Sequence, residues 1–127
     1  MKIQEEVKTD KAPKAVGPYS QAVKTDGLIF VSGQIGVDPK TNALVEGIEN
    51  QIEQVLKNII AILETAGVNL ENVVRCDIYL KNIVDYAKVN EIYGKYFSKD
   101  PKPARLTIEA SNLPKSALIE ISCIASY

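Results

Sequence analysis

Arg105 is the side chain of this sequence whose type is hardest to explain by folding alone. It is one of only two arginines in a chain with thirteen lysines, and it stands in the stretch PARLTIEA, residues 103–110. Apolar and polar residues alternate there, which predicts a β-strand with Arg105, Thr107 and Glu109 on one face. A planar guanidinium binds a carboxylate or phosphate through two parallel hydrogen bonds, which lysine cannot do. The residue type therefore indicates an anion site.

Glu120 is the carboxylate that could act beside such a site. It lies in a predicted strand at residues 118–126, on the same face as Leu118 and Ile124, which is a mostly apolar setting for a charged group. The residues alone leave two interpretations open. Glu120 forms a structural ion pair with Arg105 or a lysine, or it works on a bound ligand.

The other residue types limit the chemistry. The chain has no histidine, so acid–base work must fall to Asp, Glu, Tyr or water. Cys76 and Cys123 both lie inside apolar alternations, where a free thiol behaves as a small buried hydrophobe. No pair of possible ligands has the spacing of a zinc site, so we expect no metal centre.

Length and charge bound the class of protein. A chain of 127 residues is long enough for one hydrophobic core, so we predict a single domain over residues 1–127. The net charge is -1, and no basic run is dense enough to follow a nucleic acid backbone, so nucleic acid is disfavoured as a partner. The N-terminus lacks the apolar core of a secretory signal, and no stretch is long enough to span a bilayer. We therefore expect a cytoplasmic protein without a membrane partner.

Hydrophobic spacing predicts the elements that position these residues. Apolar residues recur at helical spacing over residues 48–66 and 83–97. Alternation and turn signals predict strands at residues 2–9, 21–24, 28–32, 72–81, 104–110 and 118–126. The resulting order βββαβαββ predicts an α+β fold with both helices on one face of a sheet.

Finer expectations come from the same patterns. An Asp26-Gly27 turn should join two strands, because this pair suits the positive φ angles of a tight hairpin. Val74 should face the core from its strand, and Tyr86 should be buried by the second helix.

The polar face of the strand at residues 104–110 needs an environment of its own. Arg105, Thr107 and Glu109 should not all enter a layer packed against helices. We therefore expect this face to meet either solvent or another subunit.

Four segments resemble the RidA family of imine deaminases, also called YjgF/YER057c/UK114. They are GPYSQAV at 17–23, VSGQIGVDPKT at 31–41, VNEIYGKYF at 89–97 and PARLTIEASNLPKSALIEI at 103–121. The four occur in the family's order and spacing, nearly end to end. The resemblance implies a chorismate-mutase-like α+β fold with a mixed sheet and two helices on one face. It also implies a homotrimer whose sheets form a central β-barrel, with small-molecule clefts between subunits.

The activity that the resemblance implies is hydrolysis of enamine and imine carboxylates, such as 2-aminoacrylate and 2-iminopropanoate, to 2-keto acids and ammonia. It requires no cofactor. Arg105 matches the family's carboxylate-binding arginine, and Glu120 matches the glutamate that holds the attacking water. The residues that line the family's cleft correspond here to Tyr19, Ser32, Gly33 and Asn90. Taken singly, each of these four also has an ordinary structural interpretation.

Three positions depart from the family pattern. Thr107 stands where cysteine is frequent, which excludes a thiol mechanism there and leaves a hydroxyl to hydrogen-bond the substrate. Leu106 replaces a small residue, but on the opposite strand face, where it alters packing. Ser122 stands where many relatives carry a second glutamate, so the cleft is less acidic.

Two other function classes stay open. The first is a non-catalytic regulatory protein that binds small molecules, of the purine regulation or translation inhibition type. Such a binder would need only the arginine, so the presence of both Arg105 and Glu120 favours the enzyme. A nuclease comes third, because the chain lacks histidine and is not basic.

Overall fold

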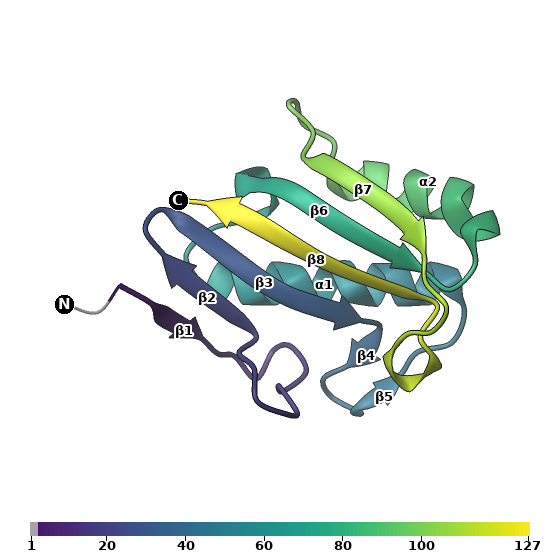
Figure 1. The fold of residues 1–127 in the computed structure, drawn as a ribbon, viewed down its shortest axis with the longest axis horizontal. Helices are drawn as coiled ribbons and strands as arrows, with labels where there is room; N and C mark the ends of the chain where they lie inside the picture. The colour runs from purple at the N-terminus through teal and green to yellow at the C-terminus, as the bar shows by residue number, and fades with distance from the viewer. Residues whose placement is uncertain (1–2) are drawn as a thin grey trace.

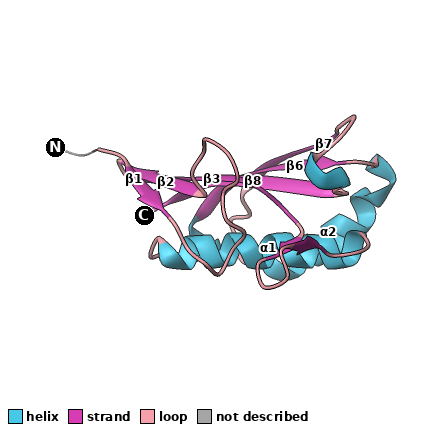
Figure 2. Cartoon of the chain, turned by 90° about the horizontal axis from the view of Figure 1, so that it is seen from below, coloured by secondary structure: helices cyan, strands magenta, loops and turns pink. Residues whose placement is uncertain are grey.

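The computed structural model describes residues 3–127 and shows a six-stranded sheet with two helices (Figure 1). The strands lie in the order β1 (Glu5–Val7), β2 (Ala22–Thr25), β3 (Leu28–Ile35), β8 (Ile119–Ser126), β6 (Val73–Leu80) and β7 (Ala104–Glu109). Neighbouring strands are antiparallel, except that β6 and β7 are parallel. Helices α1 (Ile48–Thr65) and α2 (Tyr86–Tyr96) lie on the same side of the sheet (Figure 2). The predicted α+β fold, with a mixed sheet and two helices on one face, is confirmed.

Short elements join the larger ones. A small hairpin pairs β4 (Val37–Asp38) with β5 (Ala43–Leu44), and 3-10 helices cover Leu70–Asn72, Ile83–Asp85 and Pro114–Ser116. The predicted turn between β2 and β3 is confirmed, because Asp26 and Gly27 have φ angles of 45° and 83°. The predicted first strand is shorter than expected, and its residue Lys2 lies outside the described residues.

The hydrophobic core lies between the sheet and α1. The α1 residues that are buried almost completely are Ile52, Val55, Leu56, Ile59, Ile62 and Leu63. Cys76 and Cys123 pair in register across β6 and β8 and are buried as free thiols. Burial raises the pKa of Cys76 to about 11, so this thiol is a core residue and a poor nucleophile. Within residues 3–127, no helix combines the length and apolar character needed to cross a bilayer.

Val74 is the first correction to the sequence-based expectations. Its side chain is 47% exposed, and Val73 is buried in its place. The register between β6 and β8 shifts between Val73 and Arg75, which is a β-bulge, and the strict alternation holds only after it. An irregularity of one residue reverses the faces of the residues before it, so the pattern from Cys76 onward is correct and Val74 is wrong.

The polar face of β7 is the second correction. Arg105 pairs in parallel register with buried Cys76, so Arg105, Thr107 and Glu109 lie on the side of the sheet that carries the helices. This layer tolerates them because β7 is an edge strand beside the start of α2, where polar partners are available. The Glu109 carboxylate, for example, accepts a 2.8 Å hydrogen bond from the backbone N–H of Ile83.

The opposite face of the sheet carries no helix (Figure 2). Large apolar side chains are exposed there, including Leu28 at 37%, Phe30 at 44% and Ile108 at 49%. Each of them alternates along its strand with residues that face the helices. We call this side the open face of the sheet.

Candidate active site

The guanidinium of Arg105 is held by two tyrosines of α2. Its Nη2 donates a 3.1 Å hydrogen bond to the hydroxyl of Tyr86. Its Cζ lies 4.9 Å from the ring centroid of Tyr93 and 5.6 Å from that of Tyr86, which are cation–π distances. Among residues 3–127, no carboxylate lies within ion-pair distance of Arg105. The chain thus orients this cation without neutralising it.

Polar groups that lack partners lie near this guanidinium. Thr107 is two residues along the same face of β7, and its hydroxyl is buried without a hydrogen-bond partner among residues 3–127. The hydroxyl of Tyr93 is also buried, with the Cys76 thiol as its polar neighbour. Asn90 lies one helical turn after Tyr86, on the same face of α2, so its amide is beside the Tyr86 hydroxyl. The pKa of Tyr86 is therefore below its ordinary value, because Asn90 and then Arg105 stabilise the phenolate.

Glu120 lies on β8 with its side chain on the open face. Its register partners are Tyr79 on β6 and Ile35 on β3, and no cation within residues 3–127 forms an ion pair with it. Partial burial raises the pKa of the Glu120 carboxyl above its ordinary value. The carboxylate lies directly over Gly33, where an added Cβ would come within 2.0 Å of Oε2. With any larger residue at position 33, the Glu120 carboxylate would have to move away from this place.

Ser32 adjoins Gly33 in the chain and links β3 to the loop that carries Tyr19. Ser32 precedes Gly33 at a bulge in β3, and its hydroxyl donates a 2.6 Å hydrogen bond to the carbonyl of Ser20. That bond ties β3 to the loop that carries Tyr19, whose side chain is 53% exposed. The backbone N–H of Val16 donates to the Tyr19 hydroxyl over 3.4 Å.

Gln21 anchors the same loop to the N-terminal segment. Its side-chain oxygen accepts a 2.7 Å hydrogen bond from the backbone N–H of Thr9. Its amide nitrogen donates to the carbonyls of Thr9 at 3.0 Å and Pro13 at 2.8 Å. This buried amide therefore satisfies backbone groups of Thr9 and Pro13 that have no strand pairing.

The predicted site residues thus fall into two groups. The arginine group consists of Arg105, Thr107, Asn90, Tyr86 and Tyr93. The glutamate group consists of Glu120, Gly33, Ser32 and Tyr19. Within one chain the structure does not bring the groups together, because Arg105 lies on the helix side of the sheet and Glu120 on the open face. The structural ion pair between these two residues is therefore excluded within the chain.

Tyr86 is the residue that sequence reasoning missed. Its helical spacing predicted a core position, but its side chain is 42% exposed and its hydroxyl contacts Arg105. The core contacts begin one turn later, at Val89. The i, i+4 spacing of Tyr86 and Asn90 was the signal that could have indicated a shared polar contact.

Comparison with known proteins identifies the family. The family model described as Endoribonuclease L-PSP matches residues 9–127. A RutC family protein of Pyrococcus horikoshii is 51% identical over 124 residues, which cover 97% of this chain and 98% of the relative. The chloroplastic Reactive Intermediate Deaminase A of Arabidopsis thaliana is 50% identical over 123 residues, which cover 96% of this chain and 65% of that protein. The chain belongs to the RidA family.

A solved RidA family structure shows the same fold. The crystal structure of a Rid family protein from Yersinia pestis superposes with a TM-score of 0.96 at 46% identity, over 98% of this chain and 99% of that one. The match confirms the family prediction and the arrangement of the sheet and its two helices.

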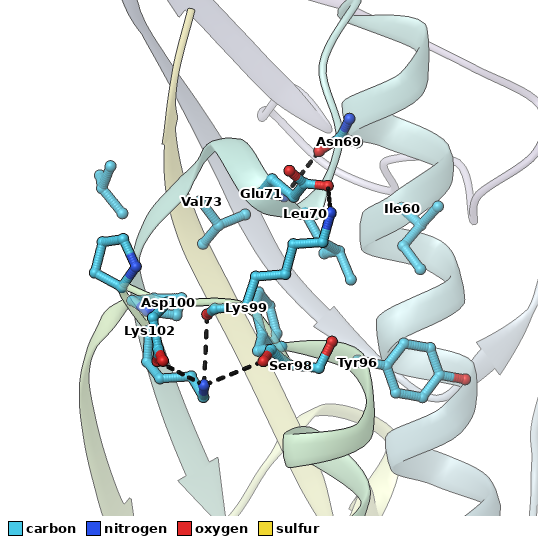
Figure 3. Close-up of a pocket in the computed structure, with 14 residues that line it drawn as sticks. Ile60, Asn69, Leu70, Glu71, Val73, Tyr96, Ser98, Lys99, Asp100 and Lys102 are labelled. Carbon is cyan, nitrogen blue, oxygen red and sulfur yellow. Dashed lines mark hydrogen bonds and ion pairs between the residues drawn. The ribbon is translucent and has the colours of Figure 1, made fainter.

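This RidA family chain also has a cavity of about 560 Å³ that holds none of the predicted site residues (Figure 3). It lies between the end of α2, the start of β6 and the loop before β7. Its charged side chains are satisfied within the chain: Lys99 pairs with Glu71 at 2.8 Å, and Lys102 pairs with Asp100 at 2.9 Å. The cavity therefore lacks the free charge that marks the two site groups.

Proposed function

We propose that this chain hydrolyses enamine and imine carboxylates, such as 2-aminoacrylate and 2-iminopropanoate, to 2-keto acids and ammonia. The observation that carries the proposal is the state of Arg105, an oriented cation that no carboxylate within residues 3–127 neutralises. The naming of the Arabidopsis relative as a reactive intermediate deaminase supports it.

Arg105 would hold the carboxylate of the substrate. The aromatic rings beside the guanidinium stabilise its positive charge through their faces and leave that charge available to an anion. The N–H groups that do not bind Tyr86 can form the parallel pair of hydrogen bonds that a carboxylate accepts. This contact fixes the distance and orientation of the adjacent C=N carbon.

Glu120 would accept a proton from the attacking water. An enamine substrate first takes up a proton at its terminal carbon and becomes the imine. Water then adds to the electrophilic C=N carbon to form a C–O bond, and a proton passes to the nitrogen. The C–N bond of the resulting carbinolamine then breaks, releasing ammonia and the 2-keto acid, with no change of oxidation state. Burial raises the pKa of Glu120, which makes its carboxylate a stronger base than an exposed one.

The two groups would meet between subunits. A cleft with both Arg105 and Glu120 needs a second copy of the chain, because the two residues lie on opposite faces of one sheet. We include in the proposal a homotrimer whose sheets form a central β-barrel, with a mass of about 42 kDa from three chains of 13.9 kDa. The exposed Phe30 and Ile108 on the open face support a covering partner.

The remaining predicted residues would line this cleft. Tyr19, Ser32 and Gly33 would approach from the subunit that supplies Glu120, and Asn90 and Thr107 from the one that supplies Arg105. The buried, unpartnered hydroxyl of Thr107 supports a ligand contact at that position, because a buried polar group without a hydrogen bond is costly.

The proposal is tested by coupling the purified chain to a pyridoxal-phosphate dehydratase that acts on serine or threonine. We expect faster keto acid release than in the dehydratase alone, and sedimentation at the mass of a trimer. An unchanged rate together with binding of a 2-keto acid would instead indicate the regulatory protein. Incubation with single-stranded RNA tests the activity in the family's description, and we expect the RNA to stay intact.

A further inference from the structure

Tyr86 is the first residue of α2, and its hydroxyl contacts the guanidinium of Arg105 on β7. It accepts a 3.1 Å hydrogen bond from Nη2 of Arg105, and Asn90 lies one turn later on the same face of α2. The side chain is 42% exposed, so it is not a core residue. Its ring also faces the guanidinium, with 5.6 Å between the ring centroid and Cζ.

This geometry restricts the plane of the guanidinium on two sides. The ring of Tyr93 lies 4.9 Å from Cζ, and the Tyr86 hydroxyl fixes one terminal nitrogen. An arginine side chain that is free at its end would have to lose rotamer freedom on binding an anion. A guanidinium that is already oriented loses less, which strengthens binding without a new contact to the ligand.

We propose that Tyr86 is a positioning residue: its hydroxyl, supported by Asn90, sets the plane of Arg105 for a carboxylate. This inference deepens the proposed function and rests on it for the identity of the substrate. It also assigns Asn90 a role through Tyr86. Selectivity for carboxylated imines over uncharged ones then depends on a phenol hydroxyl that does not itself react.

The same arrangement should weaken carboxylate binding at alkaline pH. The titratable and charged groups beside Tyr86 and its guanidinium partner are Arg105 from β7, Cys76 from β6 and Tyr93 from α2. Burial raises the pKa of both Cys76 and Tyr93, so Tyr86 is the first of the three to ionise as pH rises. A Tyr86 phenolate would pair with Arg105 and compete with a bound carboxylate.

The test compares Tyr86→Phe, which removes only the hydroxyl, with Tyr96→Phe, which removes one from the same helix away from Arg105. The probe is 2-oxobutanoate, titrated by calorimetry, with 2-oxobutanamide as the uncharged control. In Tyr86→Phe we expect Kd for the acid to rise about three- to tenfold, as for one lost hydrogen bond. We expect KM to rise in parallel, kcat to stay within about twofold and the amide to bind unchanged.

The pH profile separates positioning from a merely structural role. Wild-type affinity for 2-oxobutanoate should weaken as pH rises toward the tyrosine range, and this weakening should be absent in Tyr86→Phe. In an Arg105→Ala background, Tyr86→Phe should have no further effect. The inference would be overturned if Tyr86→Phe weakened affinity for 2-oxobutanoate by the same factor with and without Arg105. It would also be overturned if the wild type and Tyr86→Phe had the same pH profile.

The outcomes also separate this inference from the proposed function. If keto acid binding depends on Tyr86 as expected but imine hydrolysis is absent, the proposed activity fails and the positioning role stands. If hydrolysis proceeds and Tyr86→Phe leaves Kd, KM and the pH profile unchanged, the positioning role fails alone.

Discussion

The arginine group and the glutamate group are built by different means. Side chains hold the cation: the hydroxyl of Tyr86 and the ring of Tyr93 orient Arg105. The backbone makes room for the anion: Glu120 lies over Gly33, where a side chain would collide with its carboxylate. Neither charge has an ion-pair partner within residues 3–127, whereas the other arginine, Arg75, pairs with Asp77 at 2.9 Å.

The difference shows how one chain can carry two complementary charges and keep both available. Opposite charges on one face of neighbouring strands would form an ion pair and neutralise each other, but β6 separates the strands of Arg105 and Glu120. The sheet lies between them instead, with Arg105 on the helix side and Glu120 on the open face. Each charge therefore stays unpaired within residues 3–127, as the proposed site between two subunits requires.

Glu120→Gln should have the largest effect on activity. Gln cannot accept the proton of the attacking water, so we expect imine hydrolysis to fall by about 10²- to 10⁴-fold. Keto acid release coupled to a dehydratase measures it, and full activity in this variant would rule out the proposed base.

The pH dependence of the same variant has a defined sign. Burial raises the folded-state pKa of Glu120 above its unfolded value, so its contribution to stability is present at acidic pH and is lost as pH rises through the folded pKa. Glu120→Gln should remove this loss and keep or raise the melting temperature at neutral pH. The wild-type rate should fall on the acid side as Glu120 becomes protonated.

Arg105→Ala should have the next largest effect. Losing a charge-assisted contact of about 1.5–3 kcal/mol reduces kcat/KM about ten- to a few hundredfold. Arg105→Lys keeps the charge but not the planar fork, so it should recover only a minor part. Arg75→Ala is the matched control and should leave kcat/KM unchanged. A large fall in melting temperature with preserved activity per folded molecule would make Arg105 a structural residue.

Gly33→Ala should displace Glu120 and leave Arg105 in place. The added Cβ would lie 2.0 Å from Oε2, so the carboxylate must move. We expect kcat to fall about tenfold, because a base shifted by about 1 Å loses its alignment. Binding of 2-oxobutanoate should change little, since the arginine group is intact. Equal losses in kcat and in keto acid affinity would contradict the separation of the two groups.

Thr107→Val should have the smallest effect. It replaces a buried hydroxyl, which has no hydrogen-bond partner within residues 3–127, with a methyl group of similar size. We expect the melting temperature to stay the same or rise, and keto acid affinity to fall about fivefold if the hydroxyl binds the ligand. A lower melting temperature with unchanged affinity would show that the hydroxyl serves the fold.

The sequence predicted the elements better than their faces. The helical spacing of α1 and the alternation in β8 were sufficient to predict these two elements, because burial on one side of an element leaves a periodic pattern in the local sequence. Val74 was placed wrongly because a bulge is not visible in an alternating pattern. The predicted environment of Arg105 was wrong because it depends on two tertiary properties. These are the parallel register of β7 with β6 and the edge position of β7.

The candidate site shows the same division. Arg105 and Glu120 are unusual by residue type and by their neighbours in the sequence, and the family resemblance adds Tyr19, Ser32, Gly33 and Asn90. The role of Gly33 as space for a carboxylate was not predictable, because it requires the pairing of β3 with β8. Tyr86 was missed because periodicity cannot show that a helix begins at the rim of a site.

The amide of Gln21 has a consequence for how the cleft opens. One side chain holds the backbone of residues 9–13, and the same residue is adjacent to the Ser20 carbonyl that Ser32 binds. Because these hydrogen bonds all belong to the Gln21 side chain, they break together when that side chain moves away. We expect residues 9–13 and the loop that carries Tyr19 to exchange their amide protons as one cooperative unit, separately from the sheet. Order in residues 9–13 and access to the proposed cleft would then be a single equilibrium.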